Sequence, residues 1–355
     1  MLFFVYGIIM IIGGNDMKCV SISGERKLVL KDKDVPVSKD GSVVIEVKSC
    51  GICGSDIHNW EAGAPVGLVM GHEFAGVVVD PGSRQDLVKG DRVTGLPISP
   101  CGKCEACKRG DVQYCPDTWN EAVGLALTNS GGFAEYTSCR ADMVRKIPGN
   151  VSFDAACMVE PSAVSLHAAN LANIKIGDDV LIVGGGIIGL MAAEFAKMAG
   201  ARYVALVETN KKRGRKAVNF GKVDEYYDAL KEDTIPNLIT KTNGGFDVVI
   251  ECCGNAGAVT EALMTVKPGG VVVLVGVSTT PISIPMVVGV MREVKMLGAI
   301  AYTAAEFDTC LNLIANKKLN VVKYIDDLVS LNQVQESFER LTNGKDSAIK
   351  IVVKP

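Results

Sequence analysis

Hydrophobic positions in the first part of the chain fall into short runs separated by glycines and turn residues. Residues 43–47 and 75–79 form two such runs, and a turn signal at residues 80–82 ends the second. The same pattern continues to about Pro148. Short strands with frequent turns predict an irregular antiparallel β domain with a barrel-like core.

The pattern changes after Pro161, where helical stretches alternate with continuous apolar strands. Helices are predicted at residues 163–172, 190–199 and 304–316. Strands are predicted at residues 179–183, 203–207, 246–251, 271–275 and 348–353. Short buried strands alternating with helices indicate an α/β fold with a doubly wound parallel sheet of the Rossmann type.

Length and composition fit a folded two-domain protein. The chain has 355 residues, which is long for a single core. Hydrophobic residues make up 48% and charged residues 22%, a globular composition without a disorder signature. The net charge of -3 and the lack of a Lys/Arg-dense stripe argue against nucleic acid as a partner.

The N-terminal residues contain an apolar run at positions 2–12. It is too short to span a membrane, and no Lys or Arg precedes it as in a signal peptide. Residues 1–16 are therefore interpreted as an extension, with an extra strand on the first domain as the alternative. With twelve cysteines and no secretory signal, we expect a cytoplasmic protein, no membrane partner, and clustered cysteines that bind metal.

A glycine-rich motif predicts a dinucleotide site. It follows a predicted strand and opens a predicted helix, as the G-x-G-x-x-G fingerprint requires. An acid at the end of the next strand, Glu208, can accept hydrogen bonds from the ribose hydroxyls and repel a 2′-phosphate, which favours NAD over NADP. Arg213 follows in a basic segment that weakens this preference and is included among the candidate cofactor contacts. The motif consists of Gly184, Gly186, Ile187, Ile188 and Gly189.

Four clustered cysteines predict a structural zinc site. Their spacing is C-x2-C-x2-C-x7-C, and four thiolates complete a tetrahedral shell that leaves no open position. The alternatives are an iron–sulfur cluster or four unrelated cysteines. The residues are Cys101, Cys104, Cys107 and Cys115.

A second, dispersed set of residues could form an open catalytic zinc site. Cys53, His72, Glu73 and Glu160 offer a thiolate, an imidazole and carboxylates, which suit zinc with one position left for water or substrate. Spacing alone supports this grouping weakly, because a His-Glu pair is more often a surface or core pair than a ligand set.

Taken together, these motifs resemble those of the zinc-containing medium-chain alcohol dehydrogenase family. The matching segments run in family order from Met17 to the C-terminus: residues 50–58, 71–73, the four-cysteine segment, 131–136, 160–161 and the glycine fingerprint. The resemblance implies a catalytic domain split around a Rossmann domain. It divides the chain into residues 1–161, 162–300 and 301–355, with the last segment returning to the catalytic domain.

The resemblance also assigns roles to residues of the second set and its neighbours. It implies that Cys53 and His72 bind zinc and that Glu73 or Glu160 is the carboxylate ligand. It places Asp56 behind His72. It further implies that Ser55 and His58 relay the substrate proton outward while hydride moves to NAD. His167 is expected to be structural.

The function that the resemblance implies is NAD-dependent oxidation of a secondary alcohol to a ketone. Glu160 stands where the alcohol branch has a third cysteine, which favours the polyol, butanediol and threonine dehydrogenases. Residues 300–302 lack the arginine of sorbitol dehydrogenases, so a short diol is preferred over a hexitol. L-threonine stays an alternative, with Arg292 as a candidate for its carboxylate.

Two further alternatives belong to other classes. A quinone or enone reductase of the same superfamily would lack both metal sets, and a non-catalytic cofactor-binding protein should have lost the relay or the ligands. Two zinc ions per chain, NAD and a small-molecule alcohol are therefore the expected ligands. Relatives imply a homodimer or homotetramer, with residues 294–300 as the candidate interface strand.

Overall fold

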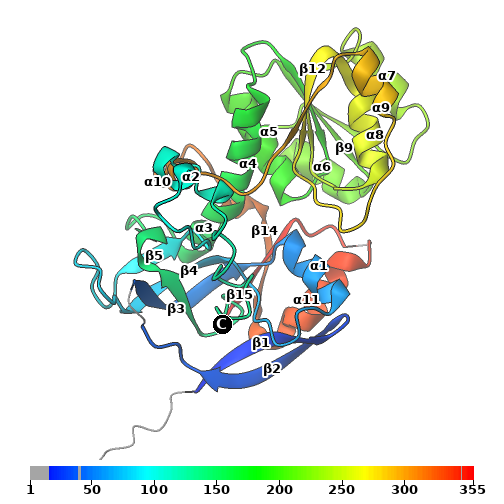
Figure 1. Ribbon diagram of the computed structural model, residues 1–355. Helices are drawn as coiled ribbons and strands as arrows, with labels where there is room; N and C mark the ends of the chain where they lie inside the picture. Colours follow the sequence, from blue (N-terminus) through cyan, green and yellow to red (C-terminus); the bar gives the residue numbers. More distant parts are fainter. Residues whose placement is uncertain (1–15, 39–40, 345) are drawn as a thin grey trace, which may run out of the picture.

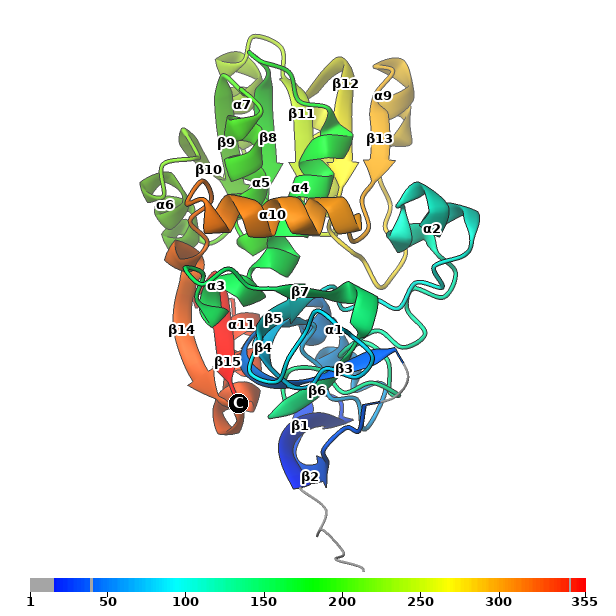
Figure 2. The ribbon, with the colours of Figure 1, turned by 90° about the vertical axis from the view of Figure 1, so that its left-hand side faces the viewer.

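The structure, a computed structural model, describes residues 16–38, 41–344 and 346–355. Within these residues the strands form one parallel sheet, one largely antiparallel sheet and a hairpin, as Figures 1 and 2 show. The hairpin consists of β1 (Asp16–Gly24) and β2 (Lys27–Asp34). The predicted fold class is confirmed.

The parallel sheet has the strand order β10-β9-β8-β11-β12-β13. Its central strand β8 is buried along its whole length, because helices cover both faces, with α4 and α5 on one side and α7 and α8 on the other (Figure 1). From β8 the chain adds β9 and β10 toward one edge of the sheet and then β11, β12 and β13 toward the other, and open α/β sheets bind ligands where the strand order changes in this way. The strands are β8 (Asp179–Val183), β9 (Tyr203–Glu208), β10 (Glu225–Asp228), β11 (Phe246–Glu251), β12 (Val266–Leu274) and β13 (Lys295–Gly298).

The second sheet joins both ends of the chain. Its order is β14-β15-β3-β4-β5-β7, and β6 also pairs with β3. The C-terminal strand β15 is antiparallel to β3, so the last residues lie beside the N-terminal part of the chain (Figure 2). The domain limits drawn from the sequence remain a prediction. The strands are β3 (Ser42–Gly51), β4 (Glu73–Asp80), β5 (Arg92–Gly95), β6 (Tyr136–Arg140), β7 (Val144–Lys146), β14 (Ile325–Ser330) and β15 (Lys350–Lys354).

The helices connect these strands. They are α1 (Gly54–Ala62), α2 (Glu105–Arg109), α3 (Phe153–Cys157), α4 (Val159–Ala172), α5 (Ile187–Met198), α6 (Lys211–Asn219), α7 (Thr234–Lys241), α8 (Ala256–Thr265), α9 (Met286–Met291), α10 (Ala304–Ala315) and α11 (Val334–Thr342). No helix in the described part of the chain is long and apolar enough to cross a membrane.

Helix α4 begins earlier than the sequence predicts. The expected helix 163–172 is the C-terminal part of α4, which already begins at Val159. Pro161 lies in its first turn, where a missing backbone N–H costs nothing because the first N–H groups of a helix have no intrahelical partner. Glu160 is consequently a helical residue rather than a loop residue.

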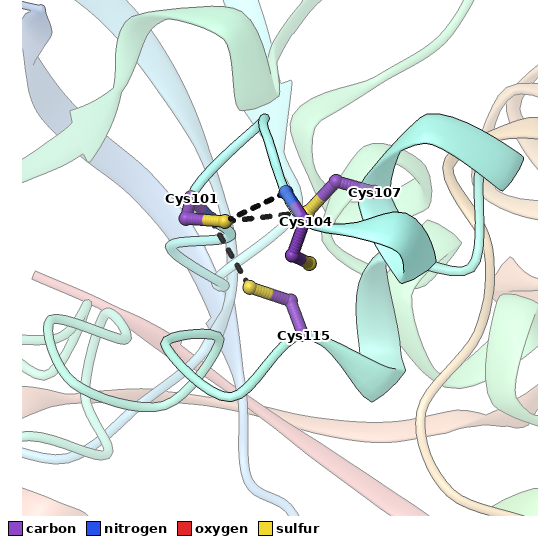
Figure 3. Close-up of side chains that lie close together, drawn as sticks. All are labelled: Cys101, Cys104, Cys107 and Cys115. Atoms are coloured by element: carbon purple, nitrogen blue, oxygen red, sulfur yellow. Dashed lines mark hydrogen bonds between the residues drawn. The ribbon is translucent and has the colours of Figure 1, made fainter.

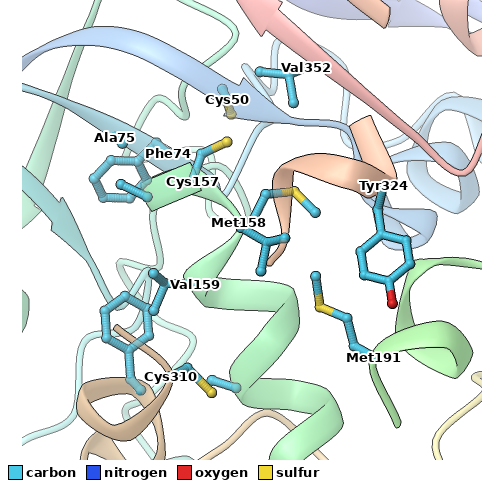
Figure 4. Packing of buried hydrophobic residues seen from close by; sticks show 14 of the residues in the cluster. Cys50, Phe74, Ala75, Cys157, Met158, Val159, Met191, Cys310, Tyr324 and Val352 are labelled. Atoms are coloured by element: carbon cyan, nitrogen blue, oxygen red, sulfur yellow. The ribbon is translucent and has the colours of Figure 1, made fainter. Parts of the chain in front are cut away.

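The hydrophobic core is continuous between the two sheets. Figure 4 shows side chains from β3, β4 and β15 packing toward residues of α4, α5 and α10. Cys50, Met158 and Met191 are fully buried members of this cluster. The prediction for residues 1–16 falls outside the described residues except for Asp16, the first residue of β1.

Candidate active site

The pairing of two strands brings the dispersed metal-ligand candidates together. Strands β3 and β4 are antiparallel, and Gly51 stands opposite Glu73 in their register. Cys53 follows β3 by two residues, and His72 immediately precedes β4. One ligand atom each from Cys53, His72 and Glu73 therefore lies within 4.8 Å of the others. Thiolate, imidazole and carboxylate in this arrangement match a zinc site with an open position.

The polar atoms around this cluster fit a metal ion. The second oxygen of Asp56 accepts a hydrogen bond from the Cys53 amide at 2.9 Å, and its first oxygen lies 3.5 Å from His72 Nδ1. Among the described residues, Glu73 Oε1 is buried without a hydrogen-bond partner. Buried polar atoms without partners are rare in proteins, and this oxygen fits the role of a metal ligand. The Asp56–His72 contact is typical of a carboxylate that orients a metal-binding imidazole.

Glu160 lies beside the cluster but outside it. It is in the first turn of α4, and its Oε1 accepts a hydrogen bond from the Tyr302 hydroxyl at 2.9 Å. Burial raises the pKa of Glu160 to about 7. The charge of His72 lowers this pKa, and the charge of Glu73 raises it. The cluster thus contains Glu73 as its carboxylate, and zinc binding by Glu160 remains a prediction.

The two relay candidates lie on helix α1. Ser55 is exposed and His58 half-buried, and a spacing of three residues places them on the same face of the helix. Cys53 is the N-cap residue of this helix, so the helix holds the relay candidates next to a metal-ligand candidate. The relay itself remains a prediction.

Two side chains at the site were not identified from the sequence. Lys350 forms a buried ion pair with Glu73, and Tyr302 holds Glu160. A lysine inside the apolar final strand was a weak available signal. No spacing rule connects residue 302 with residue 160, and only the contact between α4 and α10 brings them together.

The four-cysteine segment folds into a separate cluster. Figure 3 shows the four side chains turned toward one another around α2. The sulfurs of Cys101 and Cys107 are 4.0 Å apart, and Cys115 Sγ accepts the Cys101 amide at 3.2 Å. Backbone N–H groups lower the pKa of Cys101 to about 6, which favours the thiolate that a metal requires. All four ligand atoms lie within 4.8 Å of one another, as a closed structural zinc site needs.

The glycine motif has the geometry of a dinucleotide-binding turn. Gly184 has φ +105°, and a Cβ at Gly189 would lie 2.0 Å from the Gly184 carbonyl oxygen, so both positions require glycine. Gly186 faces open space at the N-terminus of α5, whose first residues are Ile187 and Ile188. The free N–H groups of a helix N-terminus bind a pyrophosphate.

Glu208 borders a cavity of about 640 Å³ at the carboxyl end of the parallel sheet. Its Oε2 accepts a hydrogen bond from the Gly185 amide at 2.8 Å. Arg213 Nη1 lies 3.8 Å from the same oxygen, while its Nη2 donates to the Ala348 carbonyl at 3.0 Å. Gly184 and Asn255 also line the cavity, which places the glycine turn and the acid at one site.

Two family models match the chain. Residues 39–149 match the alcohol dehydrogenase GroES-like domain, and residues 188–316 match the zinc-binding dehydrogenase domain. Sorbitol dehydrogenase of Bacillus subtilis is 31% identical over 96% of this chain and 98% of its own.

Two solved structures extend the similarity to the fold. The 2R,3R-butanediol dehydrogenase of B. subtilis has a TM-score of 0.84 and 30% identity, covering 96% of this chain and 99% of its own. A protein described as a zinc-binding dehydrogenase of Sinorhizobium meliloti 1021, solved with NADP bound, has a TM-score of 0.86 and 30% identity. The match covers 96% of this chain and 100% of that one.

The chain belongs to the zinc-containing medium-chain alcohol dehydrogenase family. It is an oxidoreductase that acts on CH–OH groups of small-molecule alcohols, with zinc and a nicotinamide cofactor. Its relatives place it among the polyol dehydrogenases rather than the threonine dehydrogenases.

Proposed function

We propose that this protein oxidises a vicinal diol or short polyol at a secondary carbon to the ketone, with NAD as acceptor. The observation that carries the proposal is the ligand cluster of Cys53, His72 and Glu73, which contains a carboxylate and has Glu160 beside it. An oxygen-rich zinc site is harder than one with two thiolates and accepts a substrate that offers two adjacent oxygens. Sorbitol and butanediol dehydrogenases among the relatives support this substrate class.

The residues of the site divide the chemical work. When bound, zinc lowers the pKa of the substrate hydroxyl and NAD supplies the hydride acceptor. Asp56 fixes the orientation of His72 through its Nδ1 atom. Ser55 would relay the hydroxyl proton by accepting it while releasing its own toward His58, which would pass a proton to solvent, since both residues lie on the same face of α1.

We also infer a preference for NAD over NADP. Glu208 presents its carboxylate to the cavity next to the glycine turn, where it would repel a 2′-phosphate. The guanidinium of Arg213, which could otherwise bind that phosphate, is engaged by Glu208 and by the Ala348 carbonyl. The relative from S. meliloti was solved with NADP, so this preference has to be measured for the present chain.

Arg292, the candidate for binding the carboxylate of L-threonine, lies away from the cofactor cavity. Arg292 donates through Nη1 to the carbonyls of Met264 and Val266, at the amino end of β12. The cofactor cavity lies at the opposite, carboxyl end of the sheet. Arg292 is therefore too far along the sheet to hold the carboxylate of L-threonine.

We further propose two zinc ions per chain, a cytoplasmic location and a homodimer or homotetramer. The two separate ligand clusters support the zinc count. Strand β13 is the last strand of its sheet, and the neighbouring helix α9 exposes Val290 and Met291, which supports a contact with a second copy there.

Specificity constants for a panel of substrates test the proposal. The purified protein would be assayed with NAD and with NADP against ethanol, 2,3-butanediol, short polyols, sorbitol and L-threonine. We expect 2,3-butanediol or a short polyol with NAD to give the highest kcat/KM. A higher value for ethanol would contradict the substrate class, and equal use of NADP would contradict the role of Glu208.

A further inference from the structure

A fully buried lysine lies directly behind the candidate metal cluster. Lys350 is the first residue of β15, and its side chain is 0% exposed. Its Nζ forms an ion pair with Glu73 Oε2 and donates a hydrogen bond to the Ile52 carbonyl at 2.8 Å. A buried ammonium without partners would destabilise the fold by several kcal/mol. The ion pair and the hydrogen bond therefore stabilise Lys350 in its buried position.

The neighbouring backbone leaves room for this ion pair. A Cβ at Gly51 would lie 1.9 Å from Glu73 Oε2 and 2.7 Å from Lys350 Cε. Gly51 stands opposite Glu73 in the β3–β4 register, so any larger residue would push the two charged groups apart. The absence of a side chain at this position therefore serves the contact between Lys350 and Glu73.

Lys350 also fixes the segment that carries Cys53. The Ile52 carbonyl accepts from Lys350 Nζ, and the Ile52 amide donates to the Ile351 carbonyl at 3.0 Å. The residue before Cys53 is thus held at both of its polar backbone atoms by the start of β15. Lys350 consequently contacts one ligand candidate, Glu73, directly and holds the residue that precedes a second one, Cys53.

Lys350 is a cation placed among groups that carry negative charge when ionised. The other titratable groups at the cluster include the half-buried Cys53 and the buried Asp56, Glu73 and Glu160, which are anionic when ionised. A cation on the far side of Glu73 lowers the electrostatic repulsion among these groups. With Oε2 paired to Lys350, Glu73 Oε1 has no hydrogen-bond partner among the described residues and is the oxygen left to act as a ligand atom.

We propose that Lys350 is a positioning residue of the metal centre, which holds one oxygen of Glu73 so that the other is presented to the metal. This inference rests on the proposed zinc-dependent function. Lys350 does not touch the metal or the substrate itself. It determines how strongly Glu73 binds and where Cys53 is placed, as residues behind metal ligands commonly do.

Metal affinity of the purified protein tests this role. The labile metal would be exchanged for Co²⁺ with the four-cysteine zinc left in place, and Co²⁺ would then be titrated against a competing chelator. Lys350→Met should weaken Co²⁺ binding about 10- to 100-fold, the range found when a residue behind a ligand is lost. It should also shift the visible Co²⁺ spectrum, which reports on the ligand geometry.

Two further variants complete the experiment. Lys354→Met is the matched control, because Lys354 lies on the same strand but pairs with Asp154, and it should keep the wild-type affinity and spectrum. Gly51→Ala leaves both charges in place but fills the space between them, so it should weaken Co²⁺ binding as Lys350→Met does. Gly51→Ala therefore tests the positioning role even if Lys350→Met does not fold.

Wild-type affinity and an unchanged spectrum in Lys350→Met would overturn the positioning role. The same result in Gly51→Ala would overturn it if Lys350→Met were not available. Failure of the proposed function has a different signature. In that case the wild-type protein itself would hold no labile metal and would not oxidise any alcohol of the panel.

Discussion

Single side chains at the start of helix α1 combine structural and chemical roles. Asp56 is the third residue of the helix, and its carboxylate accepts the Cys53 amide while facing His72 Nδ1. One buried acid therefore caps a helix and orients an imidazole. A substitution of Asp56 would therefore disturb both the start of α1 and the orientation of His72.

The two cysteine-containing clusters should respond differently to single substitutions. Cys53→Ser should lower kcat by more than about 100-fold, beyond the loss seen for residues behind a ligand. It should leave NAD affinity nearly unchanged, because the Glu208 cavity lies on the other sheet. Zinc analysis, steady-state kinetics and an NAD fluorescence titration would measure these effects.

Cys104→Ser provides the comparison for this prediction. It removes one of four ligands of a closed site, so it should lower the Tm and release one zinc before it changes kcat. A Cys53→Ser variant with near wild-type turnover would show that Cys53 is not at the reacting metal.

At the scale of elements, hydrogen bonds connect the first turn of α10 to α4. Thr303 and Glu306 form a capping box, and the Glu306 carboxylate also accepts from His167 Nδ1 at 3.0 Å. Tyr302, the residue before this cap, holds Glu160. The cap of α10 therefore supports the segment that positions a residue beside the metal cluster.

Neutralising the Glu306 carboxylate should destabilise the fold in a pH-dependent way. Burial acts to raise the pKa of Glu306, but hydrogen bonds from His167, the Thr303 amide and Asn170 outweigh it and hold the pKa at about 2. A depressed folded-state pKa stabilises the fold above the unfolded value of about 4.3 and loses this effect as pH falls toward 2. Glu306→Gln should therefore lower the free energy of unfolding by about 1–2 kcal/mol at neutral pH.

Denaturant unfolding at pH 7 and at pH 3 would measure the effect of Glu306→Gln, which should be smaller at pH 3. Glu336→Gln is the control, since Glu336 is an exposed acid in the first turn of α11. The control should change stability by less than about 0.5 kcal/mol. Equal losses for both variants, or a loss independent of pH, would contradict the role of the Glu306 contacts.

At the scale of the whole molecule, one edge of the parallel sheet is exposed and apolar. Among the described residues, strand β13 pairs only with β12, and Val290 and Met291 on α9 are 70% and 79% exposed. Exposed strand edges and apolar patches of this kind are typical of interfaces. The proposed oligomer would bury them.

A charge placed on α9 should dissociate this oligomer. Val290→Glu would bury an unpaired carboxylate in the interface, so the apparent mass in sedimentation equilibrium should fall toward that of one chain. Val88→Glu is the control, because Val88 is 61% exposed in the loop between β4 and β5, and its variant should keep the wild-type assembly. An unchanged assembly in Val290→Glu would place the interface elsewhere.

Local pattern in the sequence determined the elements and the local motifs. The predicted strand 246–251 coincides with β11, because a short apolar run with a fixed period depends little on distant contacts. The four cysteines and the glycine turn were also recognisable, since each site is built from residues close together in the chain. The start of α4 was missed because Pro161 suggests a boundary but is tolerated in a first turn.

Tertiary structure alone decided how the dispersed residues meet. The β3–β4 register places Glu73 beside Cys53, and Glu160 is drawn to Tyr302 by the packing of α10 on α4. Lys350 reaches Ile52 across 298 positions of sequence. No periodicity links residues so far apart, because their contact depends on which strands pair and in which register, and that is fixed only when the whole sheet buries its apolar faces.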